Sequence, residues 1–221
     1  MPVKDKALEL RPLFAQLGLL GHTDGSVMFS LGQTAVICGV YGPAEVKPHK
    51  ERLEGATVEI SLRPPSGPTG LQEKAKEAVL KGLVESSILG SLHPRTSVFV
   101  SLQPLDMDGG ELAAAVNATC LALMDCSISM RCLFASVEVT RTEDGIILLD
   151  PSQKQATKAV AKATFVFESV NQDVLASHLE GRWSEKAFQA GLQAALDGSK
   201  AIFQFYRETV KRKFSKELMM K

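Results

Sequence analysis

Residues 97–126 read SVFVSLQPLDMDGGELAAAVNATCLALMDC, and we expect the rest of the fold to be organised around this stretch. The run from Val98 to Leu102 is almost continuously apolar, as is typical of a strand buried on both faces. Gly109 and Gly110 interrupt it, and apolar side chains then recur at helical spacing from Leu112 to Leu123. The stretch therefore predicts a buried strand, a sharp glycine turn and a closely packed helix.

A helix that begins directly behind two glycines is suited to binding anions, because its free N–H groups and its dipole point into the turn. Here three acidic residues, Asp106, Asp108 and Glu111, surround the turn, and no Lys or Arg stands between Arg95 and Arg131. A carboxylate at this position would repel a phosphate. We therefore predict the architecture of an anion site without the charge that an anion site needs.

The chain has 221 residues, with 25 Lys and Arg against 25 Asp and Glu, so its formal net charge is zero. Strong free-standing nucleic-acid binding usually comes with a basic excess, so any such contact is expected to be local or shared with partners. No apolar run approaches the ~20 residues of a membrane span, and residues 1–7 are polar. We expect a soluble intracellular protein without a signal peptide or membrane segment.

The cysteines form no C-x-x-C pair, and the histidines are scattered. We therefore expect reduced, mostly buried structural cysteines rather than a metal site or a disulfide framework. The histidines are expected at the surface or as capping groups. These residues are Cys38, Cys120, Cys126, Cys132, His22, His49, His93 and His178.

The N-terminal half is predicted to contain three strands and a helix before the central stretch. Residues 1–25 are expected to form an opening segment with an apolar cluster and a turn. Alternating side chains predict strands over 27–31, 34–41 and 58–62, the first two forming a hairpin, and helical periodicity predicts a helix over 71–92.

On the predicted helix, Leu71, Ala75, Val79 and Leu83 share one row with an apolar row beside it, and this side is expected to be buried. The opposite side carries charged residues, including a Glu77–Lys81 pair at the favourable i,i+4 spacing.

After residue 126 the pattern predicts strands over 136–140, 146–149, 159–167 and, more briefly, 174–179. Val137 and Val139 are expected to point inward, and Glu143-Asp144-Gly145 to form a hairpin turn. Ser184 is expected to cap a last helix with an apolar stripe from Phe188 to Val210. Its basic end, 211–216, is expected to complement the helix C-terminus. The order predicts an α+β fold with helices on mixed sheets.

The loop over 42–55 carries Lys47, Lys50 and Arg52, and it is interpreted either as a solvated charged loop or as a surface that faces nucleic acid. Asp150, at a strand end, is interpreted either as a turn-forming residue or as a ligand for Mg²⁺. A single carboxylate is a poor site for this ion, and Lys154 and Lys158 would repel it. The sequence has no G-x-S-x-G elbow and no P-loop.

Eight short motifs follow one another along residues 8–214. They are Asp24-Gly25-Ser26, Gly32-x-Thr34, Val40-Tyr41-Gly42-Pro43, His93-Pro94-Arg95-Thr96, Asp108-Gly109-Gly110, Asn117-Ala118, Ala122-Leu123 and Leu149-Asp150-Pro151. In this order they resemble the RNase PH family. The resemblance implies an RNase PH or ribosomal-protein-S5-domain-2-like fold of mixed sheets and helices. It also implies a single domain over 1–221, with halves at 8–130 and 131–214.

Active members of this family are phosphorolytic 3′→5′ exoribonucleases that work with a divalent metal. The resemblance places their phosphate-gripping Thr-Arg pair at Glu111 and Leu112, and their second acidic residue, six positions beyond Asp150, at Ala156. It therefore implies a degenerate site, with no catalytic residue, no metal and no other cofactor.

The resemblance also implies a subunit of the six-membered ring of the RNA exosome, which processes and degrades RNA, and the ending Ile202-Phe203-x-Phe205-Tyr206-Arg207 supports that subtype. Its partners would be other RNase PH-like ring subunits, an S1/KH cap subunit and RNA, in nucleus, nucleolus and cytoplasm. The expected RNA contacts are Lys47, Lys50, Arg52, Lys81 and Arg95. Two alternatives stay open: a residual RNA or DNA nuclease acting as a homodimer, and a binding module outside any ring.

Overall fold

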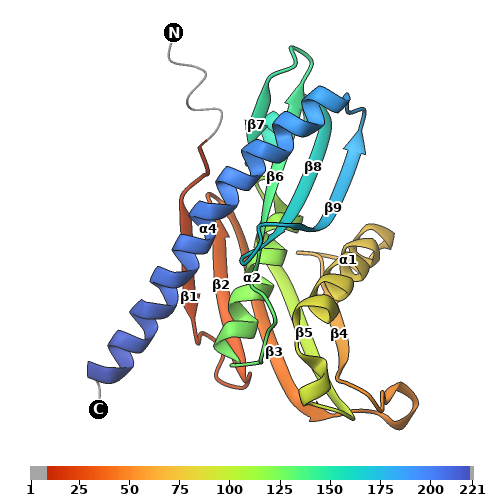
Figure 1. The fold of residues 1–221 in the computed structure, drawn as a ribbon, viewed down its shortest axis with the longest axis vertical. Coiled ribbons are helices and arrows are strands. Elements are labelled where there is room, and N and C mark those ends of the chain that lie inside the picture. The colour runs from red at the N-terminus through yellow and green to blue at the C-terminus, as the bar shows by residue number, and fades with distance from the viewer. Residues whose placement is uncertain (1–8, 220–221) are drawn as a thin grey trace.

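A computed structural model of the protein describes residues 9–219, with side chains described as far as Ser215. Residues 1–8 of the predicted opening segment lie outside this part. Two sheets and four α-helices make up the fold (Figure 1). The first sheet has the strand order β1-β2-β3-β5-β4 and is mixed, because β4 and β5 are parallel while the other neighbours are antiparallel. Its strands are β1 (Leu13–Leu17), β2 (Gly25–Leu31), β3 (Thr34–Glu45), β4 (Thr57–Leu62) and β5 (Thr96–Asp106).

The second sheet is antiparallel throughout, in the order β7-β6-β8-β9. Its strands are β6 (Phe134–Thr142), β7 (Ile147–Leu149), β8 (Ala159–Glu168) and β9 (Val174–Gly181). The helices are α1 (Leu71–Ser87), α2 (Glu111–Asp125), α3 (Gln153–Ala156) and α4 (Glu185–Met219), and single 3₁₀ turns cover Pro48–Lys50 and Gly90–Leu92. The predicted α+β class with mixed sheets is confirmed.

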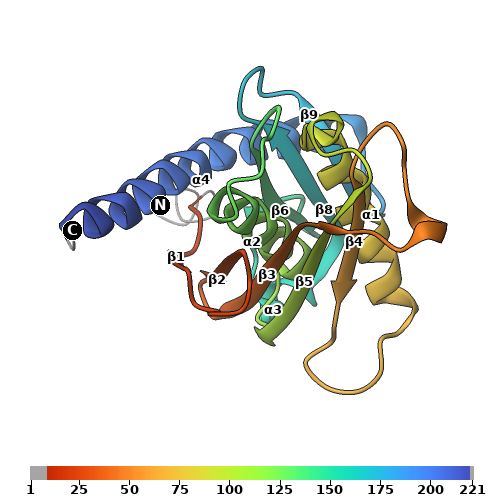
Figure 2. The same cartoon turned by 90° about the horizontal axis from the view of Figure 1, so that it is seen from below.

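Helix α2 lies between the two sheets and is the centre of the core. It packs on β2 and β3 from one side and on β6 from the other, as Figure 2 shows from below. Every side chain from Leu112 to Leu123 is buried, because small alanines let both sheets approach the helix closely. The predicted strand, turn and helix over 97–126 are confirmed. The expectation that the strand is buried on both faces is wrong, because Val98, Val100 and Leu102 are buried while Phe99 and Ser101, on the other face, are only partly buried.

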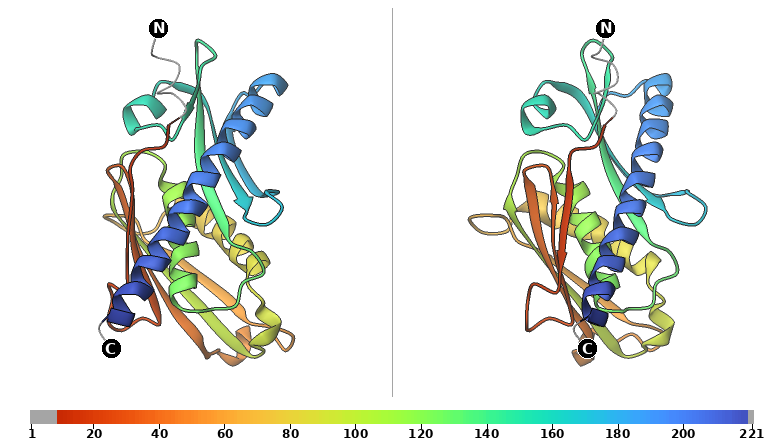
Figure 3. Two further views of the ribbon diagram at one scale, coloured as in Figure 1. Left: turned by 60° about the vertical axis from the view of Figure 1, so that its left-hand side comes forward. Right: turned by 90° about the vertical axis from the view of Figure 1, so that its left-hand side faces the viewer.

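Helix α4 crosses the second sheet and continues down beside β1 (Figure 3). The predicted stripe is buried at Ala195, Ser199, Ile202 and Tyr206. The N–H of Ala187 donates to the Ser184 hydroxyl at 3.4 Å, which confirms the predicted cap.

The basic segment at 211–216 was predicted to sit at the helix end, and this is wrong. The helix continues to Met219, and within the described side chains Lys213 donates to Asp125 of α2 at 2.6 Å. The cation therefore joins two helices instead of neutralising one helix terminus. The side chain of Lys216 lies outside the described residues.

Strand β1 was not predicted, because its five residues were taken for part of an apolar cluster. The strand pairs with β2 along its whole length, from Leu13 opposite Leu31 to Leu17 opposite Val27. It is an edge strand in which Ala15 is buried and Phe14 is half exposed. Five residues are too few for the alternation of apolar and polar side chains to predict a strand. The segment forms a strand because it pairs with β2.

Helix α1 is shorter than predicted and rotated from the predicted orientation. It ends at Ser87, where Ile88 turns extended and bridges to Met130. The helix buries Leu80, Leu83, Val84 and Ser87, whereas Leu71 is 85% exposed. The predicted Glu77–Lys81 pair is absent from the described residues, because Glu77 instead accepts the backbone N–H of Leu62 at 2.7 Å.

The four cysteines are free thiols, and all but the half-buried Cys126 are buried, as predicted. Burial raises the pKa values of Cys38 and Cys120 to about 12, so both stay protonated at neutral pH. His22, His49 and His178 are exposed and His93 is partly buried. Within residues 9–219 no helix is long and apolar enough to cross a membrane.

Candidate functional site

The glycine turn between β5 and α2 has the backbone geometry that the sequence predicted. Gly109 and Gly110 have φ values of 81° and 70°, in the left-handed region that glycine adopts without steric cost. A Cβ on Gly109 would also lie 2.6 Å from the carbonyl oxygen of Pro151. The two glycines therefore let the turn pack directly against the segment that follows β7.

Arg11, from the segment before β1, fills the space between this turn and Asp150. Its Nε and Nη2 donate to the two carboxylate oxygens of Asp150 at 2.8 and 2.6 Å, and its backbone N–H donates to the same carboxylate at 3.1 Å. The Asp150 side chain is only 1% exposed and that of Arg11 is 17% exposed. This bidentate, nearly buried arrangement is the strongest form of such a pair.

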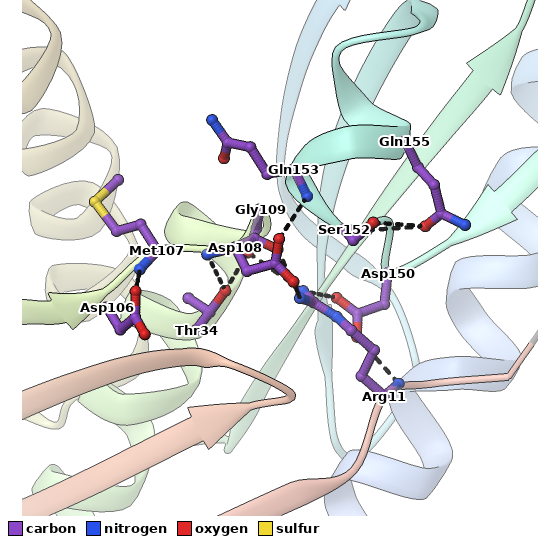
Figure 4. Close-up of polar contacts among 10 residues, drawn as sticks. All are labelled: Arg11, Thr34, Asp106, Met107, Asp108, Gly109, Asp150, Ser152, Gln153 and Gln155. Atoms are coloured by element: carbon purple, nitrogen blue, oxygen red, sulfur yellow. Dashed lines mark hydrogen bonds and ion pairs between the residues drawn. The ribbon is translucent and has the colours of Figure 1, made fainter.

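The same guanidinium also holds the turn itself (Figure 4). Nη1 of Arg11 donates to the carbonyl of Asp108 at 2.7 Å, and Nη2 donates to the carbonyl of Gly109 at 3.2 Å. The Thr34 hydroxyl donates to the Gly109 carbonyl at 2.6 Å and accepts the N–H of Asp108 at 3.0 Å. Arg11 therefore joins the turn to Asp150 after β7, and Thr34 joins the same turn to the beginning of β3.

This network answers the open question about Asp150. The residue follows β7, has a φ of 47°, and its carboxylate is fully engaged by Arg11. It thus fits the turn-forming interpretation, with an ion pair that the sequence did not reveal. A metal ion at this carboxylate would have to displace the guanidinium. Among the described side chains, residues 9–215, no group of three or more His, Cys, Asp or Glu is placed to hold a metal.

Two of the acidic side chains around the turn form ion pairs with cations from outside residues 97–126. The sequence analysis did not predict these pairs. Glu111 forms a close ion pair with Lys76 of α1, and Asp108 lies 3.8 Å from Arg11. Leu112 and Ala156, at the two other positions of the degenerate site, are both buried. The central stretch supplies no cation to the helix N-terminus, as the sequence predicted, but two distant residues, Lys76 and Arg11, offset part of its negative charge.

A cavity of about 520 Å³ opens beside the turn, between α1, the start of α2 and the second sheet. Its charged lining residues are Lys76, Glu111, Glu138, Lys162 and Glu180. Lys162 and Glu138 lie on one face of the sheet with Thr164, which pairs in register with Glu138. The cavity is therefore polar on its sheet side.

Glu138 was overlooked in the sequence analysis. The alternation of β6 correctly places Val137 and Val139 inward, but no prediction was made for Glu138 between them. In the structure both faces of the strand are covered, and Glu138 is 9% exposed. Burial raises the pKa of Glu138 to about 7, opposed by the nearby Lys162. The sequence signal for its burial was weak: the residues on either side, from 134 to 140, are otherwise apolar or small and uncharged.

The five predicted RNA contacts lie away from this cavity, none of them in its lining. Three of them are engaged in ion pairs with acidic neighbours, at distances of 2.9 to 3.3 Å. The pairs are Lys50–Glu59, Arg52–Glu85 and Arg95–Glu51. Arg52 lines a separate groove of about 870 Å³ together with Arg131.

The side chains of Lys47 and Lys81 make no hydrogen bond or ion pair within the described residues. Lys47 is exposed in the β3–β4 loop, and Lys81 is partly buried on α1. Lys81 shares its helix row with Glu77 and Glu85, both of which contact the strand β4 or the loop before it. Of the five predicted RNA contacts, the two without a side-chain partner therefore lie in the loop before β4 and on the helix after it.

Comparison with known proteins gives one family match and several full-length relatives. Residues 9–129 match the RNase PH description "3′ exoribonuclease family, domain 1". An exosome complex exonuclease RRP46 homolog from Arabidopsis thaliana is 35% identical, covering 76% of this chain and 70% of the relative. The exosome complex component Rrp41 of Pyrococcus furiosus is 29% identical over 96% of this chain and 88% of the relative. The crystal structure of rice (Oryza sativa) Rrp46 superposes with a TM-score of 0.87 at 31% identity, over 92% of this chain and 96% of the rice chain.

Proposed function

Because this chain belongs to the 3′ exoribonuclease (RNase PH) family, we propose that it is a non-catalytic ring subunit of the RNA exosome. In this role it supports 3′→5′ RNA processing and degradation by scaffolding its neighbours and channelling RNA. We place it as the counterpart of exosome component 5, the Rrp46 type. Support comes from the plant Rrp46 relatives, which match over most of the chain.

One observation carries the proposal of a silent site. The position where active relatives grip phosphate holds Glu111, ion-paired with Lys76, and a buried leucine. A phosphate placed at this helix start would meet the carboxylate of Glu111, and the guanidinium nearby, that of Arg11, is already held by Asp150. The carboxylate of Asp150 is already occupied by Arg11, and Ala156 has no ligand atom to offer a metal. Both halves of the phosphorolytic machinery therefore lack their chemistry.

The test is a phosphorolysis assay on the purified protein with single-stranded RNA, inorganic phosphate and Mg²⁺. We expect no release of nucleoside diphosphates above background, while an active archaeal Rrp41-containing ring serves as the positive control. Release of nucleoside diphosphates that depends on phosphate would overturn the proposal. Release of monophosphates without phosphate dependence would indicate hydrolysis by another route.

The alternative function is a residual RNA or DNA nuclease that acts as a homodimer outside the ring. Asp150 is the one acidic residue of the family's metal site that this chain retains. Any such activity should disappear in Asp150→Asn, provided that circular dichroism shows the variant to be folded. The ion pair with Arg11 favours the scaffold over this alternative, because it removes the carboxylate from metal binding.

We further propose one RNase PH-like domain over 1–221, with halves at 8–130 and 131–214, that contacts other RNase PH-like ring subunits, an S1/KH cap subunit and RNA. Co-purification with mass identification of partners tests this, and a free monomer in cell extract would favour a binding module outside the ring. The expected compartments are nucleus, nucleolus and cytoplasm, which imaging of the tagged protein would check.

A further inference from the structure

The cavity beside the glycine turn contains a carboxylate that makes no hydrogen bond to the described side chains or backbone. Glu138 is 9% exposed and lines the cavity. Lys162 lies near it, but among the described side chains, as far as residue 215, none forms an ion pair with it within 4 Å. A buried carboxylate without a partner is costly, so this group is prepared to receive a hydrogen-bond donor.

The other carboxylates of the lining differ from Glu138. Glu111 is paired with Lys76 across the gap between α2 and α1. Glu180 is 61% exposed and lies 3.3 Å from the His178 ring. Glu138 is thus the one deeply buried acceptor of the described lining that has no donor.

In the second sheet, two polar side chains lie in register with Glu138, between it and the edge of the sheet. Glu138 pairs with Thr164, and Thr164 pairs with His178 on the edge strand β9. Thr164 is 6% exposed and the His178 side chain is 45% exposed. The three side chains form a polar track that leads from a buried carboxylate through a hydroxyl to the open edge of the sheet.

The α1 wall of the cavity contributes Ala75 and Val79 together with Lys76. The Lys76 ammonium is already paired with Glu111. A ligand that contacts both walls would therefore have an aliphatic body and a cationic or donating head that reaches Glu138.

We propose that this cavity binds a primary alkylammonium group, with Glu138 as its counter-ion and Thr164 as a second acceptor. The ammonium carries three donors on a flexible alkyl chain, which matches the carboxylate, the hydroxyl and the apolar side chains of the α1 wall. Such a group is supplied either by a lysine side chain of a neighbouring protein or by a free aliphatic polyamine. This inference does not depend on the proposed absence of catalysis.

The test is isothermal titration calorimetry of the full chain at pH 8.5 with n-butylammonium and 1,4-diaminobutane, and with n-butanol as the neutral analogue. Both amines are expected to bind and butanol is not. Binding should be at least tenfold weaker in Glu138→Gln, retained in part in Glu138→Asp, and unchanged in Glu143→Gln, which alters an exposed carboxylate in the hairpin turn. The expected loss follows from removing a charge-assisted hydrogen bond of about 1.5–3 kcal/mol.

The pH dependence gives a second readout. Glu138 ionises near pH 7, whereas the amines stay charged, so binding should weaken about tenfold from pH 8.5 to pH 6. The charged groups around it are Lys162 on β8, Lys76 and Glu111 on the helices, His178 and Glu180 on β9, and Asp150 with Arg11 behind β6.

The two sources of the ammonium are distinguished by repeating the titration on the assembled complex. If a lysine of a neighbouring subunit occupies the cavity, the amines bind the isolated chain but not the complex. If a free polyamine is the ligand, both bind. The proposal is overturned if the amines give no heat with the wild-type chain, if butanol binds equally well, or if Glu138→Gln binds as tightly as wild type.

Discussion

At the scale of single residues, the protein depends on charges that are compensated from far away in the chain. The carboxylate of Asp150 is buried, and its partner Arg11 comes from 139 positions earlier. Replacing both members of such a pair by apolar residues can be nearly neutral, but removing one leaves an unpaired buried charge. The network around the glycine turn is therefore expected to respond asymmetrically to mutation.

Arg11→Met is predicted to lower the free energy of unfolding by about 3–5 kcal/mol, because Asp150 would remain buried without a counter-ion. Urea denaturation at pH 7 measures the change. As a control, Arg207→Met changes an exposed side chain that makes no hydrogen bond or ion pair with the described residues, and it should change stability by less than about 0.5 kcal/mol. Equal losses in both variants would contradict the role assigned to Arg11.

Glu138 is predicted to make stability depend on pH. Its pKa is raised from 4.5 to about 7 in the folded state. The folded state therefore keeps a proton that the unfolded state loses. The stabilisation is fully present below about pH 4.5 and is lost as pH rises through about 7.

Glu138→Gln should accordingly match the wild type at pH 5 and be more stable than it at pH 8, by an amount on the order of 2–3 kcal/mol. Unfolding curves of both proteins at the two pH values test this. A wild-type protein that gains stability between pH 5 and 8 relative to the variant would show that the sign is wrong.

At the scale of elements, helix α4 joins the two sheets through both packing and hydrogen bonds. Phe188 contacts Phe165 of β8 at a ring distance of 5.5 Å, and Phe205 contacts Phe29 of β2 at 6.3 Å. Between them the Tyr206 hydroxyl donates to Asn117 Oδ1 at 2.9 Å. The buried Asn117 side chain is the point where α4, α2 and β6 meet.

Asn117→Ala is predicted to cost roughly 3 kcal/mol or more, because it leaves the Tyr206 hydroxyl and both backbone groups of Ser136 without partners. Tyr206→Phe removes the hydroxyl without orphaning the backbone and should cost only about 1 kcal/mol. Thermal and urea unfolding of the two variants measures the ratio. A larger loss in Tyr206→Phe than in Asn117→Ala would contradict this account.

At the scale of the whole molecule, the zero net charge and the paired surface cations limit what the isolated chain can do with RNA. Affinity for nucleic acid comes mainly from cations that release counter-ions from phosphates. Most of the predicted contacts are already neutralised by glutamates. The chain is thus suited to contributing a few charges to a surface that it shares with other subunits.

In a reconstituted ring, Lys47→Ala/Lys81→Ala is predicted to reduce the salt dependence of RNA binding by a slope of about 1.4, since each lost phosphate contact accounts for about 0.7 on single strands. Filter binding across a salt series measures it. Lys154→Ala/Lys158→Ala, at two exposed lysines beyond β7, should leave the slope unchanged. An equal reduction in both double variants would mean that the effect is only one of net charge.

The sequence by itself determined the elements whose pattern is local and strong. The buried strand, glycine turn and helix over 97–126 followed from an apolar run, two glycines and a helical repeat. The hairpins followed from alternating side chains and turn residues, and the last helix from its apolar stripe and its capping serine. The resemblance to the RNase PH family also let us propose that Glu111 and Leu112 replace the phosphate grip, because that comparison needs only the identities of the residues.

The tertiary structure alone decided how those residues are partnered. Strand β1 exists because β2 pairs with it, and the orientation of α1 follows from its packing on β4. Arg11 reaches Asp150, Lys76 reaches Glu111, and the covering of β6 on both faces buries Glu138. Burial and ion pairing depend on which distant segments meet in space, and the spacing of residues along one chain carries no record of that.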